Sequence, residues 1–206
     1  MTAAGYASVE ELKDWLGEDT GDLDQVLEQQ ILAASRWIDS VCGRRFYREP
    51  EDDEAPPVAR VYDAVSPWEL RIDDAREITG IATDDDADGT HETIWLPGDW
   101  QAVHPSVPTP EDRPIRRIRA VGSRRFPSRV RRAGLVEVTG RWGWETIPAP
   151  VHEACLIQAS RLLKRRHSPE GITGFGNEFG HIRVSTRDDP DVVAMLRPYM
   201  LRVSLA

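Results

Sequence analysis

The acidic run DDDADG, residues 84–89, is the first candidate for chemistry. Its D-x-D-x-D-G pattern opens a calcium loop, in which carboxylate oxygens surround the ion and a bidentate Glu closes the loop at the twelfth position. Here the twelfth residue is Trp95, and the flanking residues alternate as in strands. We therefore interpret the run as a hairpin turn that uses Asp-Gly, and we assign no metal-binding residue.

A second candidate is the glycine-rich stretch GITGFGNEFGHIRV, residues 171–184. Glycines can cradle phosphate, but a dinucleotide-binding loop needs a strand before the glycines and a helix that opens after them. Here a helical pattern precedes the glycines and a short β-like run follows, so we assign no nucleotide or other cofactor. The pattern favours a loop that contacts a neighbouring protein. Its candidate contact residues are Phe175, Asn177, Phe179 and Ile182.

The third candidate is the segment 113–132, which contains nine arginines. Such a density can neutralise phosphates, and Phe126 within it could stack on a base. The spacing of Ile115, Ile118 and Val121 instead indicates a strand with one solvated face. We favour pairing of this segment with an acidic protein surface and keep nucleic-acid binding as the alternative.

Residues for catalysis are few. The five histidines are scattered, and the sequence contains no H-E-x-x-H, G-x-S-x-G or P-loop motif. Cys42 and Cys155 lie far apart in apolar helical patterns, which is typical of packed, reduced thiols. We therefore assign no catalytic residue and predict that the protein is not an enzyme.

The elements that position these candidates follow from hydrophobic spacing. Ser8 and Glu11 have the spacing of a capping box at the start of a short helix, residues 8–16. Apolar stripes predict longer helices over 23–45 and 151–166, which we expect to pack on each other, and a final helix over 190–201 that Pro198 strains. Between them the period changes to two, which predicts short strands at 58–65, 69–72, 78–83, 92–97, 115–121 and 135–142.

These elements predict a mostly α fold: a small helical bundle with a large β-rich insertion between its central helices. We expect one domain over residues 1–206, in which 1–47 and 148–206 form the helical core and 57–146 form the insertion. The acidic stretch at 48–57 is interpreted as an exposed linker. No apolar run approaches the ~20 residues that a membrane span needs, so we predict no membrane association.

Charge is distributed unevenly along the chain. The formal net charge is -9, but residues 1–112 hold 27 acidic and 8 basic residues, whereas residues 113–206 hold 8 acidic and 18 basic ones. Opposite potentials on one molecule favour head-to-tail pairing with further copies of it. The alternative is that separate solvated faces simply differ in charge.

The order of these features resembles the head-tail connector (adaptor) proteins of tailed bacteriophages. The resemblance is carried by YASVEELKDWLG near the start, ILAASRWIDSVCGRRFY at the end of the second helix and the passage VEVTGRWGW-x-x-IP-x-x-V-x-x-A at residues 136–154. RLLKRRHSP, the Gly-Phe-Gly loop and DPDV near the end complete it. It covers both helical ends of the chain, and the β insertion matches in character only.

The resemblance implies a structural virion protein without enzymatic activity, made in the host cytoplasm and located at the neck. Such connectors form a ring, usually of twelve subunits, beneath the portal of the DNA-filled capsid. A tail or stopper protein attaches below, and DNA passes through the lumen without sequence recognition. The glycine-rich loop would then be an inter-subunit contact. The C-terminal segment would dock onto the portal through Val192, Val193, Leu196, Tyr199, Met200 and Leu201.

Overall fold

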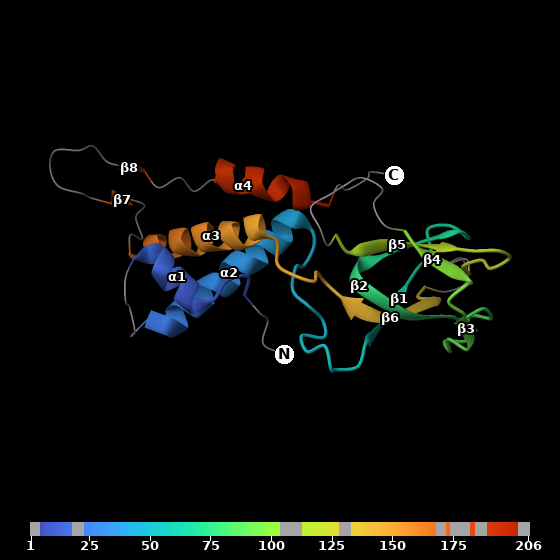
Figure 1. Cartoon of the computed structure of the whole chain (residues 1–206). Helices are drawn as coiled ribbons and strands as arrows, with labels where there is room; N and C mark the ends of the chain where they lie inside the picture. The colour runs from blue at the N-terminus through green and yellow to red at the C-terminus, as the bar shows by residue number, and fades with distance from the viewer. Residues whose placement is uncertain are drawn as a thin grey trace. The chain divides into compact units, whose positions relative to one another are not determined.

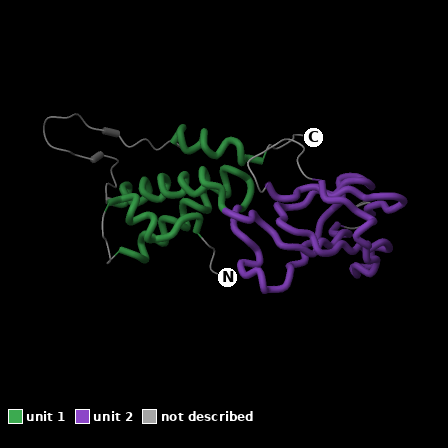
Figure 2. Tube along the Cα trace, viewed as in Figure 1, with its two compact units in different colours: residues 1–45, 147–206 green, residues 46–146 purple. Residues whose placement is uncertain are grey.

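The computed structural model describes residues 5–17, 23–103, 113–127, 133–167, 172–173, 182–183 and 189–201. The chain forms two compact units (Figure 2). The first combines Met1–Arg45 with Ile147–Ala206, and the second is Phe46–Thr146. The first unit is helical and the second holds a six-stranded sheet (Figure 1).

The described residues of the first unit form four α-helices. They are α1 (Val9–Leu16), α2 (Asp24–Cys42), α3 (Ala149–His167) and α4 (Pro190–Leu196), and a 3-10 turn, η2 (Arg197–Tyr199), follows α4. The predicted capping box of α1 is confirmed, because the Ser8 hydroxyl accepts from the Glu11 N–H and the Glu11 carboxylate accepts from the Ser8 N–H. Helix α4 is shorter than predicted, since Pro198 has no N–H to donate to a preceding turn. The short strands β7 (Ile172–Thr173) and β8 (Ile182–Arg183) pair antiparallel.

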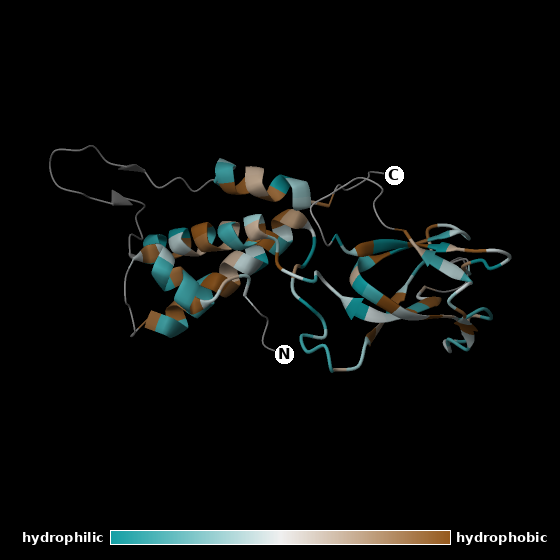
Figure 3. Ribbon diagram, in the orientation of Figure 1, coloured by the Kyte–Doolittle hydropathy of each residue, from teal (hydrophilic) through white to brown (hydrophobic). Residues whose placement is uncertain are grey.

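Helices α2 and α3 pack on each other, as predicted. Small buried side chains, among them Ala34, Ala154 and Ala159, allow the two helices to approach closely. The Ser35 hydroxyl of α2 lies 3.5 Å from the Cys155 sulfur of α3. In Figure 3 the helices carry both apolar and polar residues, as amphipathic helices do. The described residues include no helix long and apolar enough to cross a membrane.

The sheet of the second unit is antiparallel throughout. Its strands are β1 (Val58–Tyr62), β2 (Glu69–Thr83), β3 (Thr93–Trp95), β4 (Trp100–Ala102), β5 (Ile115–Ala120) and β6 (Val136–Trp142). Their order is β1-β6-β2-β5-β4, and β3 pairs with β2. Strand β2 is long enough to pair with β5 through its first half and with β6 and β3 through its second half.

Two strand predictions are corrected by this sheet. Segments 69–72 and 78–83 belong to one strand, β2, and the short strand β4 was not predicted. The polar pair Asp73 and Asp74 obscures the alternation in the middle of β2. Asp74 is nevertheless buried, because its carboxylate pairs with Arg116 (3.2 Å) and accepts from the Trp144 indole N–H (3.2 Å). Both partners come from other parts of the chain, so the sequence pattern of β2 does not show them.

The second unit has a core of its own. The Trp95 ring stacks on Phe126 with a centroid distance of 4.6 Å, and the Trp95 indole N–H donates to the Thr83 hydroxyl (3.1 Å). The other buried members of this core are Leu70, Ile72, Ala75, Ile81, Ile115, Ile118, Ala120, Val136, Val138 and Trp142.

The predicted mostly α fold class is therefore wrong. Of the residues that the structure describes, 36% are helical and 26% are in strands, and the fold is a β-rich α/β fold. The reason lies in the size of the sheet: a strand of 15 residues joins five others around an independent apolar core, so the β unit does not depend on the helices for burial.

Gly143 provides a test of the contact between the first and last segments of the second unit. Its φ is +87°, and a Cβ there would lie 1.8 Å from the Tyr47 carbonyl oxygen. We expect Gly143→Ala to lower the free energy of unfolding by roughly 2–4 kcal/mol, because backbone strain and a backbone clash add up. Urea unfolding followed by tryptophan fluorescence measures the change. Gly98→Ala is the matched control, since nothing lies within 4 Å of a Cβ at Gly98; equal midpoints for the two variants would contradict the prediction.

Candidate functional site

The predicted docking residues of the C-terminal segment divide into two groups in the structure. Val192, Leu196 and Tyr199 are buried within the helical unit, with exposed fractions of 0%, 0% and 6%. Val193, Met200 and Leu201 are half-buried. The apolar face of the helix to which the resemblance assigns docking therefore serves in part to seat α4 on its own chain, where it packs against α3 and α2.

Polar contacts hold both ends of this segment. At the N-terminus of α4, the Asp189 carboxylate accepts from the Asp191 N–H (3.0 Å) and pairs with Arg161 of α3 (2.8 Å). At the other end, the Leu201 N–H donates to the Cys42 carbonyl at the end of α2 (2.8 Å). Of the predicted docking residues that the structure describes, Val193, Met200 and Leu201 are therefore the partly exposed ones, on a segment that is fixed in place.

The glycine-rich loop is described only at its margins. Phe175, Asn177 and Phe179 lie outside the described residues. Ile182 lies in β8, where its backbone pairs with that of Thr173 in β7. The β-like run predicted after the glycines thus pairs with a run before them.

Residues 84–92, here called the acidic turn, connect the antiparallel strands β2 and β3. Asp84 is buried and organises the turn: one carboxylate oxygen accepts from Ala87 N–H (2.7 Å) and Asp88 N–H (3.1 Å), and the other accepts from Gly89 N–H (2.8 Å). Burial raises the pKa of Asp84, but these three N–H donors outweigh it and hold the pKa below its usual range. The turn is therefore built around a carboxylate.

Four carboxylates of the acidic turn could in principle meet a cation. One oxygen from each of Asp84, Asp86, Asp88 and Glu92 lies within 4.8 Å of the others. The oxygens of Asp84 already accept backbone hydrogen bonds, and Trp95, at the position of an EF-hand's closing Glu, is in the apolar core. The arrangement is explained by the turn itself, and its other acidic side chains are exposed.

The arginine-rich segment is described over residues 113–127, and its roles differ from residue to residue. Phe126 is 3% exposed and stacks on Trp95, so it is not available to stack on a base as the nucleic-acid alternative requires. The Arg124 guanidinium pairs with Asp99 (3.1 Å). Arg117 and Arg119 are exposed on β5, and neither forms an ion pair with a described residue.

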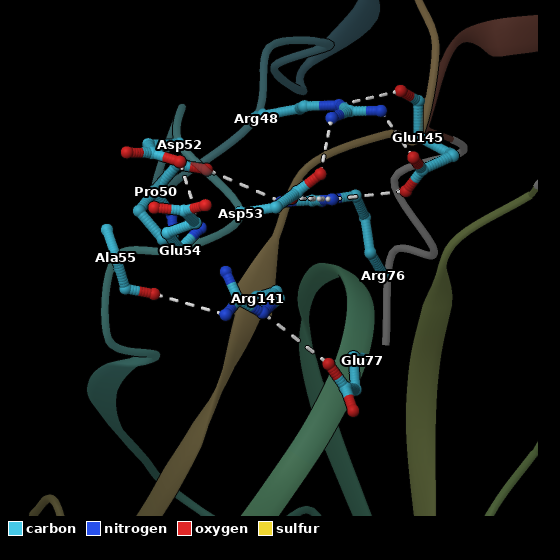
Figure 4. Close-up of polar contacts among 10 residues, drawn as sticks. All are labelled: Arg48, Pro50, Asp52, Asp53, Glu54, Ala55, Arg76, Glu77, Arg141 and Glu145. Atoms are coloured by element: carbon cyan, nitrogen blue, oxygen red, sulfur yellow. Dashed lines mark hydrogen bonds and ion pairs between the residues drawn. The ribbon is translucent and has the colours of Figure 1, made fainter.

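A network of ion pairs involves residues 48–57, the stretch predicted to be an exposed linker (Figure 4). Arg48 pairs with Asp53 (3.0 Å) and with Glu145, and its Nε donates to the Glu145 carbonyl (2.8 Å). Arg76, whose side chain is 8% exposed, pairs with Asp53 (3.0 Å) and Glu145 (3.1 Å). The hydrogen bond from Arg76, supported by the charge of Arg48, lowers the pKa of Asp53. The stretch is thus anchored to the sheet rather than free.

A third arginine extends this anchoring. Arg141 of β6 donates to the Ala55 carbonyl (3.1 Å) and lies 3.6 Å from the Glu77 carboxylate of β2. The network therefore joins the segment before β1 to strands β2 and β6 and to the segment after β6. Its arginines neutralise fixed carboxylates, which is a structural role. Sequence reasoning missed it because the partners are up to 97 residues apart.

Both cysteines are buried, as predicted, and neither forms a disulfide. Burial raises the pKa of the Cys42 thiol to about 11 and also raises that of Cys155. Both thiols are therefore protonated at neutral pH and unsuited to nucleophilic attack.

Comparisons with known proteins bear on the fold. No protein-family model and no curated protein sequence matches the chain. Among solved structures, the chain is similar to the neck of an empty gene transfer agent (GTA) particle computed with C6 symmetry, at 18% identity. It is also similar to the neck of a native GTA particle computed with C12 symmetry, at 20% identity, and to the virion of a native GTA particle, at 21% identity.

Each of these matches covers 96% of this chain and 91% of the other, with a TM-score of 0.55. At these identities the likeness establishes the fold, and it extends over both units. The predicted resemblance to phage connectors is therefore supported at the level of the fold, since neck structures of a phage-like particle share it.

The acidic turn yields a prediction on stability and pH. We expect Asp84→Asn to lower the urea midpoint of the second unit, because an amide nitrogen replaces one of the oxygens that accept backbone N–H groups. The folded pKa of Asp84 lies below the unfolded one, so the stabilisation is present above the unfolded value and is lost as pH falls through the folded value. The difference in urea midpoint between wild type and Asp84→Asn should therefore become smaller as the pH is lowered.

Urea titrations at several pH values measure this difference. Asp85→Asn is the matched control, because Asp85 is exposed on the same turn. A pH-independent difference between wild type and Asp84→Asn would show that charge on Asp84 does not stabilise the turn.

Proposed function

We propose that the protein is a structural virion protein of the neck: a head-tail connector without enzymatic activity. It forms a ring beneath the portal and joins the DNA-filled capsid to the tail or to a stopper. The observation that supports this proposal is the fold, which is shared with neck structures of GTA particles over 96% of the chain. A likeness that includes both the helical unit and the sheet unit is more specific than a match to either alone.

The ring is proposed to contain twelve copies around a channel for DNA. The C12 symmetry used for one of the similar neck structures supports this number. A closed ring needs two different faces on each subunit, one for each neighbour. The uneven charge along the sequence is proposed to supply faces of opposite sign, and the glycine-rich loop with Phe175, Asn177, Phe179 and Ile182 is a further proposed inter-subunit contact.

Portal docking is proposed for the C-terminal segment. With α4 seated as described, the partly exposed residues Val193, Met200 and Leu201 would contact the portal directly. Val192, Leu196 and Tyr199 would support them from below by packing on α2 and α3. This division of roles requires no detachment of α4 from its own unit.

Co-sedimentation with portal-bearing capsids tests docking. We expect the wild-type chain to sediment with the capsids and Val193→Asp/Met200→Asp to bind at least about tenfold more weakly, because two carboxylates would be desolvated at the interface. Val65→Asp is the control, since Val65 is 58% exposed in the other unit. Circular dichroism verifies that each variant is folded.

The outcomes separate two claims. If the wild-type chain does not sediment with the capsids, the connector proposal fails. If wild type and the Val193/Met200 variant sediment equally, only the assignment of the portal contact to this segment fails.

A further inference from the structure

The outer surface of strands β2 and β5 carries a cluster of arginines. Arg71 of β2 is directly opposite Arg117 of β5, and Arg119 is opposite Glu69. Directly paired residues of antiparallel strands share a face of the sheet, as do alternate residues within a strand. The neighbouring pair Leu70 and Ile118 is buried in the core, so the arginines are on the outside. We call Arg71, Arg117 and Arg119 the basic face.

Few contacts with the described residues neutralise the positive charge of the basic face. The Arg71 side chain is 62% exposed, and its Nε is 3.7 Å from the nearest Glu69 oxygen. Arg117 and Arg119 pair with no carboxylate among the described residues. Within the described part of the chain, Glu69 is thus the one carboxylate within ion-pair distance of the three guanidinium groups, and an acidic partner would find donors that need not be released from these internal contacts.

Two exposed apolar side chains lie near the end of β5. Val121, directly after β5, is 39% exposed and follows Arg117 and Arg119 at alternate positions. Trp68, which immediately precedes β2, is 47% exposed, and the Arg125 guanidinium carbon is 3.1 Å from its ring centroid. The Trp68 carbonyl accepts from the Ala120 N–H (3.0 Å), so Trp68 is paired with a residue of the other, buried face at the edge of the sheet. Tryptophan and arginine are the residue types most enriched at the centres of protein interfaces.

The acidic turn has complementary charge and a fixed shape. Asp85, Asp86, Asp88 and Glu92 are exposed on it, and the backbone hydrogen bonds to Asp84 hold the loop in one conformation. Because the turn is ordered before contact, little conformational entropy is lost when it binds.

The positions of the two surfaces favour contact between copies. The basic face is at the beginning of β2, whereas the acidic turn follows the end of the same strand. Surfaces at opposite ends of one strand of a sheet are held apart within a chain, but they can meet between chains. When two copies pair in this head-to-tail way, the pair still has one free basic face and one free acidic turn. Further copies can therefore add until a ring closes.

We propose that the basic face binds the acidic turn of a second copy of this chain. The proposal rests on the proposed function as a ring-forming neck protein and assigns the surfaces that join its subunits. Protein rather than DNA is the occupant that the chain's chemistry favours: the exposed apolar side chain of Val121 directly follows the arginines of β5, and the net charge of -9 opposes a polyanion.

Charge reversal in the full chain tests this contact. The basic-face variant is Arg117→Glu/Arg119→Glu, the acidic-turn variant is Asp86→Arg/Asp88→Arg, and a third protein combines all four substitutions. Sedimentation velocity at low salt measures their self-association. We expect wild type to associate, with the association weakening as salt increases. Each two-residue variant should associate at least about tenfold more weakly, and the combined variant should regain association because the two charges have exchanged places.

Two controls carry the same changes in net charge at other exposed positions. Lys164→Glu/Arg166→Glu on α3 matches the basic-face variant, and Glu51→Arg/Glu54→Arg matches the acidic-turn variant. Both should associate as wild type does. If a control loses association equally, net charge and not this contact is responsible, and the proposal is overturned.

Three further outcomes would overturn the proposal. One is a wild-type chain that stays monomeric at low salt up to roughly millimolar concentration. Another is a combined variant that does not regain association. The third is DNA retention that Arg117→Glu/Arg119→Glu abolishes without changing self-association, which would assign the basic face to nucleic acid. Capsid co-sedimentation of the same proteins reports separately on the neck function, which survives if the wild-type chain binds capsids.

Discussion

The antiparallel contact between residues 47–49 and 142–143 is the constraint on which the organisation of this chain depends. Glu49 and Trp142 exchange backbone hydrogen bonds of 3.0 and 2.7 Å, and Gly143 lies against the Tyr47 carbonyl. Helices α2 and α3 pack on each other although the whole second unit separates them in sequence. The chain that leaves α2 must therefore return to α3. Direct pairing of the first and last segments of the sheet unit meets that requirement.

Arginine–carboxylate contacts reinforce this closure. Arg48 and Arg76 both bridge Asp53 to Glu145, so charges from before β1, within β2 and after β6 neutralise one another. A single surface ion pair stabilises a protein little. When one nearly buried arginine pairs with two carboxylates, its side chain loses conformational entropy only once while two contacts form. The same use of fully partnered polar groups recurs at Asp74 within β2.

Several described groups that could do chemistry serve the fold instead. Both thiols are buried and have raised pKa values, and the buried carboxylate of Asp84 holds a turn by accepting backbone N–H groups. Among the described residues, the side chains available to a partner include exposed arginines on β5 and half-buried apolar residues such as Val193 in the C-terminal segment. Side chains of these types are common in protein interfaces.

The sequence by itself determined the local features. The Ser8–Glu11 capping box, the amphipathic helices α2 and α3, most strands of the sheet and the turn after β2 depend on residue spacing within one element. Such spacing reports which side of an element is apolar, and it does so whatever that side later contacts. The separation of acidic and basic residues along the chain is likewise a property of sequence alone.

Only the tertiary structure decided which partners meet. Asp74 is buried in the middle of a long strand because its carboxylate pairs with Arg116 and accepts a hydrogen bond from Trp144. Phe126 is buried because it stacks on Trp95. The extent of the sheet depends on long-range contacts of this kind, and the fold class depends on the extent of the sheet. The spacing of apolar residues along α4 predicts that one face of the helix is buried. The same spacing would result whether that face packed against another chain or, as here, against helices of its own unit.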